Sequence, residues 1–265
     1  MNAWEDSETA AFYEAFCQGH SRYTCANRAL IAHARLAPGM RVLDLGAGTG
    51  RTAEMALRCL GEEGRLLCVE PAAGMRAEGM RRVPDSRVQW SGSLPQAPES
   101  FDRILCGASI WQLDPLQDTF GSLARLLRSG GALCCNIPAL YLMEPDAPGG
   151  GGDPWLLSLP ASLLATADGF PIGQPIARQT PDPLSRSAIT SWLKAAGLRA
   201  RWWSFRLRLT QDAYADWLKI PVLTEQMFSG LAPQARAQRI DRALQSVDRS
   251  SWKWEKWRGW TAWKD

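Results

Sequence analysis

The stretch Val42-Leu43-Asp44-Leu45-Gly46-Ala47-Gly48-Thr49-Gly50 decides the fold. An apolar run that contains one carboxylate leads into three glycines at alternate positions. A strand that ends in such a loop and turns into a helix lets a ligand lie against the backbone, because no Cβ stands in the way. The spacing fits neither common phosphate cradle: Arg51 stands where the dinucleotide motif needs its third glycine, and no Gly-Lys-Ser/Thr ending follows.

The pattern on either side of this loop alternates between strands and helices. We expect strands at 41–45, 65–70, 87–91, 101–107 and 132–137, and helices at 50–60, 73–81 and 115–128. Strands separated by helices predict a parallel, doubly wound sheet. A helix at 185–196 and strands at 199–209 and about 255–264 would complete a Rossmann-like α/β fold with seven strands.

The rest of the chain is expected to cap and extend this core. Residues 6–35 are predicted to be helical with a break near Gly19, and 211–247 helical with breaks at Pro221, Gly230 and Pro233. We therefore predict four parts: an N-terminal helical cap at 1–40, a cofactor-binding core at 41–138, an irregular lid at 139–184, and a completion of the core at 185–265. The last part carries a helical insertion at about 211–250.

A second carboxylate narrows the class of ligand that the loop can bind. Glu70 ends the next strand about 20 residues after the loop, and Pro71 follows it. An acidic residue there can hold both hydroxyls of a ribose and would repel a 2′-phosphate. The loop and Glu70 together indicate an adenosine-like ligand without an obligatory pyrophosphate.

With Met75, these residues resemble the first two motifs of the class I S-adenosylmethionine-dependent methyltransferases. Three further segments occur in the family's order, and they are Gly92-Ser93-Leu94-Pro95 with Ser100-Phe101-Asp102, Cys106 to Trp111, and Leu126 to Gly131. The resemblance extends over roughly residues 22–138. It is strongest for the small-molecule branch that includes the ubiquinone and menaquinone methyltransferases.

The resemblance implies a methyltransferase that uses S-adenosylmethionine and releases S-adenosylhomocysteine. Gly46, Gly48 and Gly50 would pass under its methionine part, with Asp44 fixing the loop, and Glu70 would bind the ribose. The remaining implied cofactor contacts are Pro71 and Met75 beside the adenine, Gly92 and Ser93 at its edge, Gly107 and Ala108 by the sulfonium, and Tyr23 closing over the site. No metal is expected.

The acceptor side is less defined by the sequence. His20, near the break in the N-terminal helices, is our candidate for a catalytic base. Tyr13 and Trp111 are candidates for lining the acceptor pocket, together with Trp203, Tyr214 and Trp217 from the C-terminal half. Because that half is rich in Trp and Leu, we predict a small aromatic or otherwise apolar acceptor. The sequence does not separate O-, N- and C-methylation.

Composition excludes or disfavours other classes. The net charge of +3 gives no strong footprint for nucleic acid, although Arg199, Arg201, Arg206 and Arg208 interleave with aromatic residues. We interpret that stretch as a solvated strand face, and the tryptophans at 252–263 as packing or dimer residues rather than an interfacial belt. No apolar run is long enough to span a membrane, and seven unpatterned cysteines favour a cytoplasmic protein. The alternatives are an RNA or protein methyltransferase, a nicotinamide-dependent oxidoreductase, or a non-catalytic cofactor-binding module.

Overall fold

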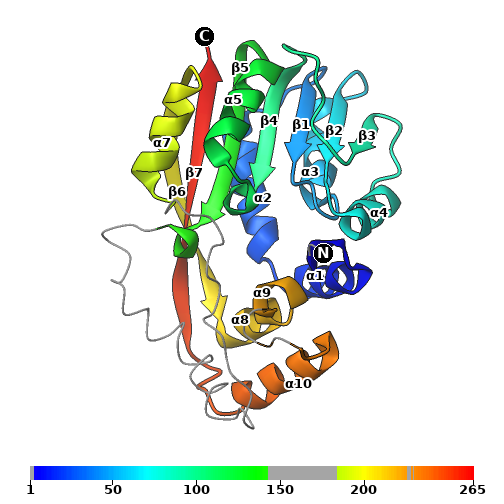
Figure 1. Ribbon diagram of the computed structural model, residues 1–265, viewed down its shortest axis with the longest axis vertical. Coiled ribbons are helices and arrows are strands. Elements are labelled where there is room, and N and C mark those ends of the chain that lie inside the picture. Colours follow the sequence, from blue (N-terminus) through cyan, green and yellow to red (C-terminus); the bar gives the residue numbers. More distant parts are fainter. Residues whose placement is uncertain (1–2, 143–183, 226–227, 229) are drawn as a thin grey trace.

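The computed structural model describes residues 3–142, 184–225, 228 and 230–265 of the chain (Figure 1). One sheet has the order β3-β2-β1-β4-β5-β7-β6, and β7 runs antiparallel to both of its neighbours. The strands are β1 (Arg41–Leu45), β2 (Arg65–Val69), β3 (Val88–Ser91), β4 (Phe101–Gly107), β5 (Leu127–Pro138), β6 (Leu198–Thr210) and β7 (Trp252–Lys264). This confirms the doubly wound, seven-stranded Rossmann-like α/β fold.

Helices cover both faces of the sheet because successive strand side chains point to opposite faces. Val42 of β1 packs in a cluster with residues of α2 (Arg22–Ala34) and α3 (Arg51–Leu60). Its neighbour Leu43 packs in a second cluster with residues of α5 (Leu116–Leu126) and α7 (Arg186–Ala195). Burial on both faces explains why β1 reads as an apolar run rather than as an alternating one.

Most predicted elements appear close to their expected bounds, and the largest departure is at β5. The expected helix at 115–128 ends at Leu126, and the strand begins at Leu127 instead of residue 132. Leu127 pairs with Phe101, and the register shifts before Ala132 pairs with Arg103. The two glycines at 130–131 therefore lie within an irregular strand rather than at a helix end.

A small helical unit lies at the edge of the sheet where β1 and β4 end (Figure 1). It consists of η1 (Ala3–Glu5), α1 (Ser7–Gly19), α8 (Gln211–Leu218), α9 (Pro221–Thr224) and α10 (Pro233–Leu244). Its core includes Phe16, Trp217 and Ile240, so segments far apart in the sequence share one apolar cluster. The expected breaks at Pro221 and Pro233 are confirmed, since each proline begins a helix, where its missing N–H costs nothing.

The remaining elements are α4 (Ala73–Arg82) and two short helices, η2 (Ile110–Gln112) and η3 (Ala139–Tyr141). The chain's N-terminal helices break between Gly19 and Arg22, as predicted. Most of the expected lid at 139–184 lies outside the described residues, which here include only 139–142 and Leu184.

Candidate active site

The glycine loop lies at the switch point of the sheet, where β1 pairs with β2 on one side and β4 on the other. The N–H groups of Gly46 and Ala47 donate to the carbonyl of Val69, at 2.8 and 3.2 Å, which folds the loop over the end of β2. Gly46 and Gly48 have φ values of +69° and +55°. A crevice at the carboxyl ends of the strands on either side of such a point is the usual ligand site of open α/β sheets.

The Gly46 position has no room for a side chain. A Cβ there would lie 2.5 Å from Oγ of Ser109, which follows β4. Ser109 in turn donates to the carbonyl of Leu45 at 3.3 Å. The loops after β1 and β4 are thus held against each other, and the glycine permits that approach.

Glu70 is fixed by backbone donors and keeps acceptor capacity. Its Oε2 accepts from the N–H of Gly48 at 2.8 Å, and its Oε1 accepts from the N–H of Ala72 at 2.9 Å. Burial raises the pKa of Glu70, although these two hydrogen bonds oppose the rise. Each carboxylate oxygen offers two lone pairs, so one on each remains for a pair of vicinal hydroxyls.

Asp44 is the most perturbed acid of the site. It is 1% exposed, and its Oδ2 has no hydrogen-bond partner among the described residues. Burial raises its pKa to about 8, and the neighbouring Glu70 carboxylate adds to the rise. A buried, unpartnered carboxyl beside a ligand loop suits a ligand that brings a cation, because such a charge would offset the cost of ionising it.

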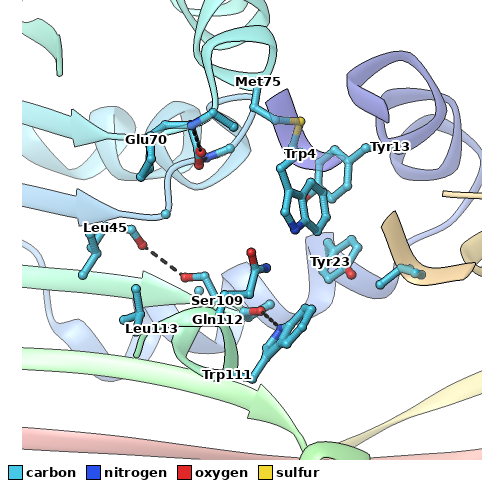
Figure 2. Close-up of a pocket in the computed structure, with 17 residues that line it drawn as sticks. Trp4, Tyr13, Tyr23, Leu45, Glu70, Met75, Ser109, Trp111, Gln112 and Leu113 are labelled. Atoms are coloured by element: carbon cyan, nitrogen blue, oxygen red, sulfur yellow. Dashed lines mark hydrogen bonds between the residues drawn. The ribbon is translucent and has the colours of Figure 1, made fainter. Parts of the chain in front are cut away.

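The glycine loop and Glu70 border a cleft between the sheet edge and the helical unit (Figure 2). Ten of the residues predicted from the sequence line it, and they are Tyr13, Tyr23, Gly46, Gly48, Glu70, Pro71, Met75, Gly107, Ala108 and Trp111. Seven further lining residues were not predicted, and they are Trp4, Leu45, Ala72, Ser109, Gln112, Leu113 and Leu223. The structure thus brings the loop, Glu70 and the predicted N-terminal aromatics to one place.

The wall after β4 is held by Asn136, which sequence reasoning missed. The N–H of Ala108 donates to the backbone carbonyl and to the side-chain Oδ1 of Asn136, both at 3.0 Å. Asn136 Nδ2 donates to the carbonyl of Ala26 in α2, and the side chain is fully buried. Ala108 adopts φ +56°, which is unusual for a residue with a Cβ. The carbonyl of Ala108 accepts from the Trp111 indole at 2.8 Å, so Ala108 orients the tryptophan.

Aromatic side chains from η1, α1 and α2 line the cleft. Trp4 meets Tyr13 edge-on with ring centroids 6.3 Å apart, and Tyr13 lies 5.4 Å from Tyr23. The Tyr23 hydroxyl accepts from the Trp217 indole at 2.9 Å. Burial raises the pKa of Tyr13 and of Tyr23, so both hydroxyls stay protonated at neutral pH and can act as hydrogen-bond donors.

The helical unit contacts the glycine loop through one buried acid, Glu14 of α1. Its carboxylate accepts from the Thr49 hydroxyl within the loop and from Arg51 at the start of α3, the latter at 2.6 Å. It also pairs with Arg82 at the end of α4. This contact was not predictable from the sequence, because Glu14 looks like an ordinary surface residue of an amphipathic helix.

Four predicted cofactor residues do not line the cleft. Asp44 lies within β1, and Gly50 caps the start of α3 in the left-handed region at φ +82°. Gly92 and Ser93 are exposed beyond β3. Nη1 of Arg76 would lie 3.3 Å from a Cβ on Gly92, and it donates to the carbonyls of Glu70 and Pro71. This guanidinium therefore separates the 92–93 turn from Glu70.

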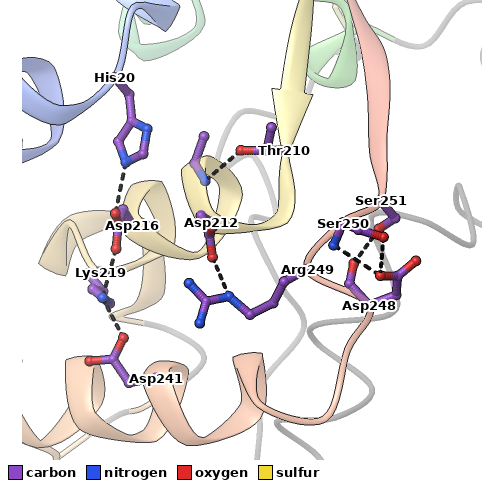
Figure 3. Close-up of polar contacts among 11 residues, drawn as sticks. His20, Thr210, Asp212, Asp216, Lys219, Asp241, Asp248, Arg249, Ser250 and Ser251 are labelled. Carbon is purple, nitrogen blue, oxygen red and sulfur yellow. Dashed lines mark hydrogen bonds and ion pairs between the residues drawn. The ribbon is translucent and has the colours of Figure 1, made fainter.

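His20, the predicted base, is also absent from the cleft lining. Its Nε2 lies 2.8 Å from Oδ2 of Asp216, and Oδ1 of the same carboxylate accepts from Lys219 at 2.7 Å (Figure 3). Burial would raise the pKa of Asp216, but the hydrogen bonds from Lys219 and His20 hold it below its ordinary value. The imidazole joins the end of α1 to α8, and this pairing accounts for its position.

The three acceptor residues predicted from the C-terminal half do not line the cleft either. Trp203 stacks on His33 of α2 at a centroid distance of 3.9 Å. Tyr214 and Trp217 are buried in the core of the helical unit. Trp217 reaches the site only through its hydrogen bond to Tyr23.

Two absences concern only the part of the chain described above. No group of three or more His, Cys, Asp or Glu residues there is arranged to hold a metal ion. Within the same residues, no helix is long and apolar enough to cross a membrane.

Comparison with known proteins agrees with this geometry. Residues 43–135 match the methyltransferase domain family. The chain is 29% identical over 117 residues to the ubiquinone/menaquinone biosynthesis C-methyltransferase of Coxiella burnetii, covering 41% of this chain and 47% of that protein. It is 33% identical over 114 residues to the demethylmenaquinone methyltransferase of Beutenbergia cavernae, covering 42% and 45%. The chain thus spans about half the length of the curated relatives it matches.

A solved structure extends the likeness of fold to nearly the whole chain. The crystal structure of a putative sarcosine dimethylglycine methyltransferase from Galdieria sulphuraria superposes with a TM-score of 0.59 at 16% identity, covering 97% of this chain and 99% of that one. At that identity the superposition speaks for the fold alone. The family match over residues 43–135, with the glycine loop and the carboxylate after β2, supports a class I S-adenosylmethionine-dependent methyltransferase domain in this part of the chain.

Proposed function

We propose that the chain binds S-adenosylmethionine in the cleft of Figure 2 and transfers its methyl group to a small aromatic or apolar acceptor. One observation carries the proposal: the glycine loop, the backbone-fixed Glu70 and a set of half-buried aromatic side chains line the same cleft. The bound cofactor would supply an electrophilic methyl group on a sulfonium. Every other requirement falls on this chain's residues.

The fit of the cofactor follows from the donors and acceptors present. The two free lone pairs of Glu70 would accept the ribose hydroxyls, and Pro71 and Met75 would flank the adenine. The bare backbone at Gly46 and Gly48 would face the methionine part, whose ammonium suits the unpartnered carboxyl of Asp44. Gly107 and Ala108 would lie beside the sulfonium.

The acceptor side of the cleft favours an uncharged, planar molecule. Tyr13, Tyr23 and Trp111 provide aromatic walls, and Leu223 provides an aliphatic one. Among the described lining residues, Glu70 is the sole carboxylate and no lysine or arginine occurs. Such walls would align the acceptor and exclude water, which is what an in-line displacement requires of the protein.

No described lining residue is suited to remove a proton at neutral pH. Histidine is absent from that lining, the tyrosine pKa values are raised, and Glu70 is assigned to the ribose. The acceptor would therefore be one that is nucleophilic without help, such as an electron-rich ring carbon. The relative named as a ubiquinone/menaquinone biosynthesis C-methyltransferase supports this choice.

We also propose a cytoplasmic location, since all seven cysteines are free thiols. The four-part division at 1–40, 41–138, 139–184 and 185–265 stays a proposal, as does a homodimer. The helical unit combines helices from the first and the last of these parts. This arrangement supports a single cap formed by those helices over the site.

Calorimetry with S-adenosylmethionine, S-adenosylhomocysteine and NADH is the first test. We expect micromolar binding of the first two and none of NADH. An acceptor screen by mass spectrometry would then compare hydroquinones, phenols, amines and RNA. Binding without transfer to any of these would favour a non-catalytic cofactor-binding module, and transfer to RNA that weakens with salt would favour the nucleic-acid alternative.

A further inference from the structure

The strands β6 and β7 form a long ribbon whose two faces differ in burial toward the end that carries Thr210 and Trp252. In β6 and β7, Arg206 is opposite Lys256 and Arg208 is opposite Trp254. Residues opposite one another in an antiparallel pair share a face. We define the ribbon face as Trp202, Arg206, Arg208, Trp252, Trp254 and Lys256, all of which are exposed.

Burial along the strands alternates sharply. On the opposite face Leu207, Glu255 and Trp257 are buried, and Glu255 accepts two hydrogen bonds from Arg22 of α2. Glu255 is the single acidic residue of the two strands, and it points inward. The ribbon face therefore carries cations without a carboxylate from either strand.

The exposed tryptophans are unusual for a soluble surface. Trp202, Trp252 and Trp254 are 47%, 44% and 46% exposed. Guanidinium groups lie over their rings: Arg186 over Trp202 at 4.5 Å, Arg206 over Trp254 at 4.9 Å, and Arg208 over Trp252 at 4.9 Å. These contacts place a guanidinium group directly beside each exposed indole ring.

We propose that the ribbon face docks onto an anionic lipid surface. Indole side chains favour the boundary between headgroups and hydrocarbon, and arginine and lysine are attracted to anionic headgroups. The lower part of the ribbon, which bears Trp252 and Trp254, extends past the body of the sheet (Figure 1). The side chains of Trp252 and Trp254 are exposed, so a flat surface can contact this end of the ribbon.

The same details argue against two other occupants. Nucleobases need open ring faces to stack on, whereas each exposed indole has a guanidinium over one face, and Trp252 and Trp254 meet edge-on at 85° rather than as a platform. A second copy in a two-fold contact would bring this cationic face against itself, and like charges repel. The proposal is independent of methyl transfer, because it concerns residues outside the cleft.

Vesicle co-sedimentation with the full chain tests the proposal. We expect binding to phosphatidylcholine vesicles that contain about 30% phosphatidylglycerol, little binding to phosphatidylcholine alone, and loss of binding at high salt. The variant Arg206→Gln/Arg208→Gln should bind about 25-fold more weakly, at roughly fivefold for each charge. Trp252→Ser/Trp254→Ser should also weaken binding while keeping all charges.

The matched control is Arg58→Gln/Arg81→Gln, which removes the same charge from exposed positions on α3 and α4. Its binding should stay within about twofold of the parent protein. Equal loss in this control, or unchanged binding of the tryptophan variant, would overturn the proposal. Two other results would also overturn it if vesicles do not bind. One is binding of a single-stranded RNA that depends on the ribbon face, and the other is a dimer in sedimentation velocity that depends on the same face. Thermal melts of each variant confirm folding.

Discussion

The half of the molecule that carries β1 to β5 provides most of the cleft lining, whereas the half that carries β6 and β7 provides only Leu223 among the described lining residues. In the half that carries β1 to β5, most predicted site residues lie around one cleft. In the half that carries β6 and β7, Trp203, Tyr214 and Trp217 were predicted to line it and none does. The first half places its residues by strand ends and glycines within one short segment. The second half places them by packing between distant helices, which a local pattern does not encode.

The largest expected effect is in the loop of the first half. Gly48→Val places a β-branched residue at φ +55°, with its Cβ facing Met75 across the cleft. We expect cofactor affinity to fall by about 100-fold or more, because strain and lost space act together. Calorimetry measures it. Gly121→Ala in α5 is the control, since a Cβ there meets nothing within 4 Å, and its affinity should not change. Retained affinity in Gly48→Val would contradict the placement of the ligand.

In the half that carries β1 to β5, Asp44 should make the stability of the protein depend on pH. Its folded-state pKa is raised to about 8 from 3.8, so its neutral form is favoured in the ligand-free fold. The stability it supports is fully present below pH 3.8 and is lost as pH rises through about 8, by up to about 1.4 kcal/mol per pH unit within that window. Thermal melts between pH 5 and 9 should show this slope for the parent protein and a weaker one for Asp44→Asn. Equal slopes would exclude Asp44 as their source.

A smaller effect tests how the second half reaches the site. Removing the hydrogen bond between Trp217 and Tyr23 should weaken cofactor or acceptor binding by about fivefold, the worth of one such bond of about 1 kcal/mol. Tyr23→Phe, Trp217→Phe and the double variant form a cycle that separates this bond from lost packing. Additive effects in the cycle would show that Trp217 contributes packing alone.

The smallest expected effect concerns His20. Because its imidazole pairs with Asp216 and does not line the cleft, His20→Ala should leave kcat within about twofold of the parent value. Steady-state kinetics with any acceptor found in the screen would measure this. A large fall in kcat with unchanged cofactor affinity would restore His20 as the base.

Features encoded within one short segment could be predicted from the sequence, and contacts between distant segments could not. The order of strands and the loop at Gly46 and Gly48 were predictable, because the need for a bare backbone at a strand end is written locally. Glu14 and Asn136 were not, since each acts by bridging elements far apart in the chain. For β6, the alternation shows that two faces differ, but not that Trp203 faces α2 while Trp202 faces outward. Trp4 and Gln112 carried no motif at all.

The position of β7 bears on how the chain is made. This strand is late in the sequence, yet it lies between β5 and β6, and Trp257 and Trp260 are among the largest buried side chains. During synthesis β6 leaves the ribosome before the strand that joins it to the sheet. Until residues 252–264 emerge, the side of β5 that pairs with β7 stays open, with Cys134 and Cys135 beside it. Factors that shield nascent chains would therefore find their target there.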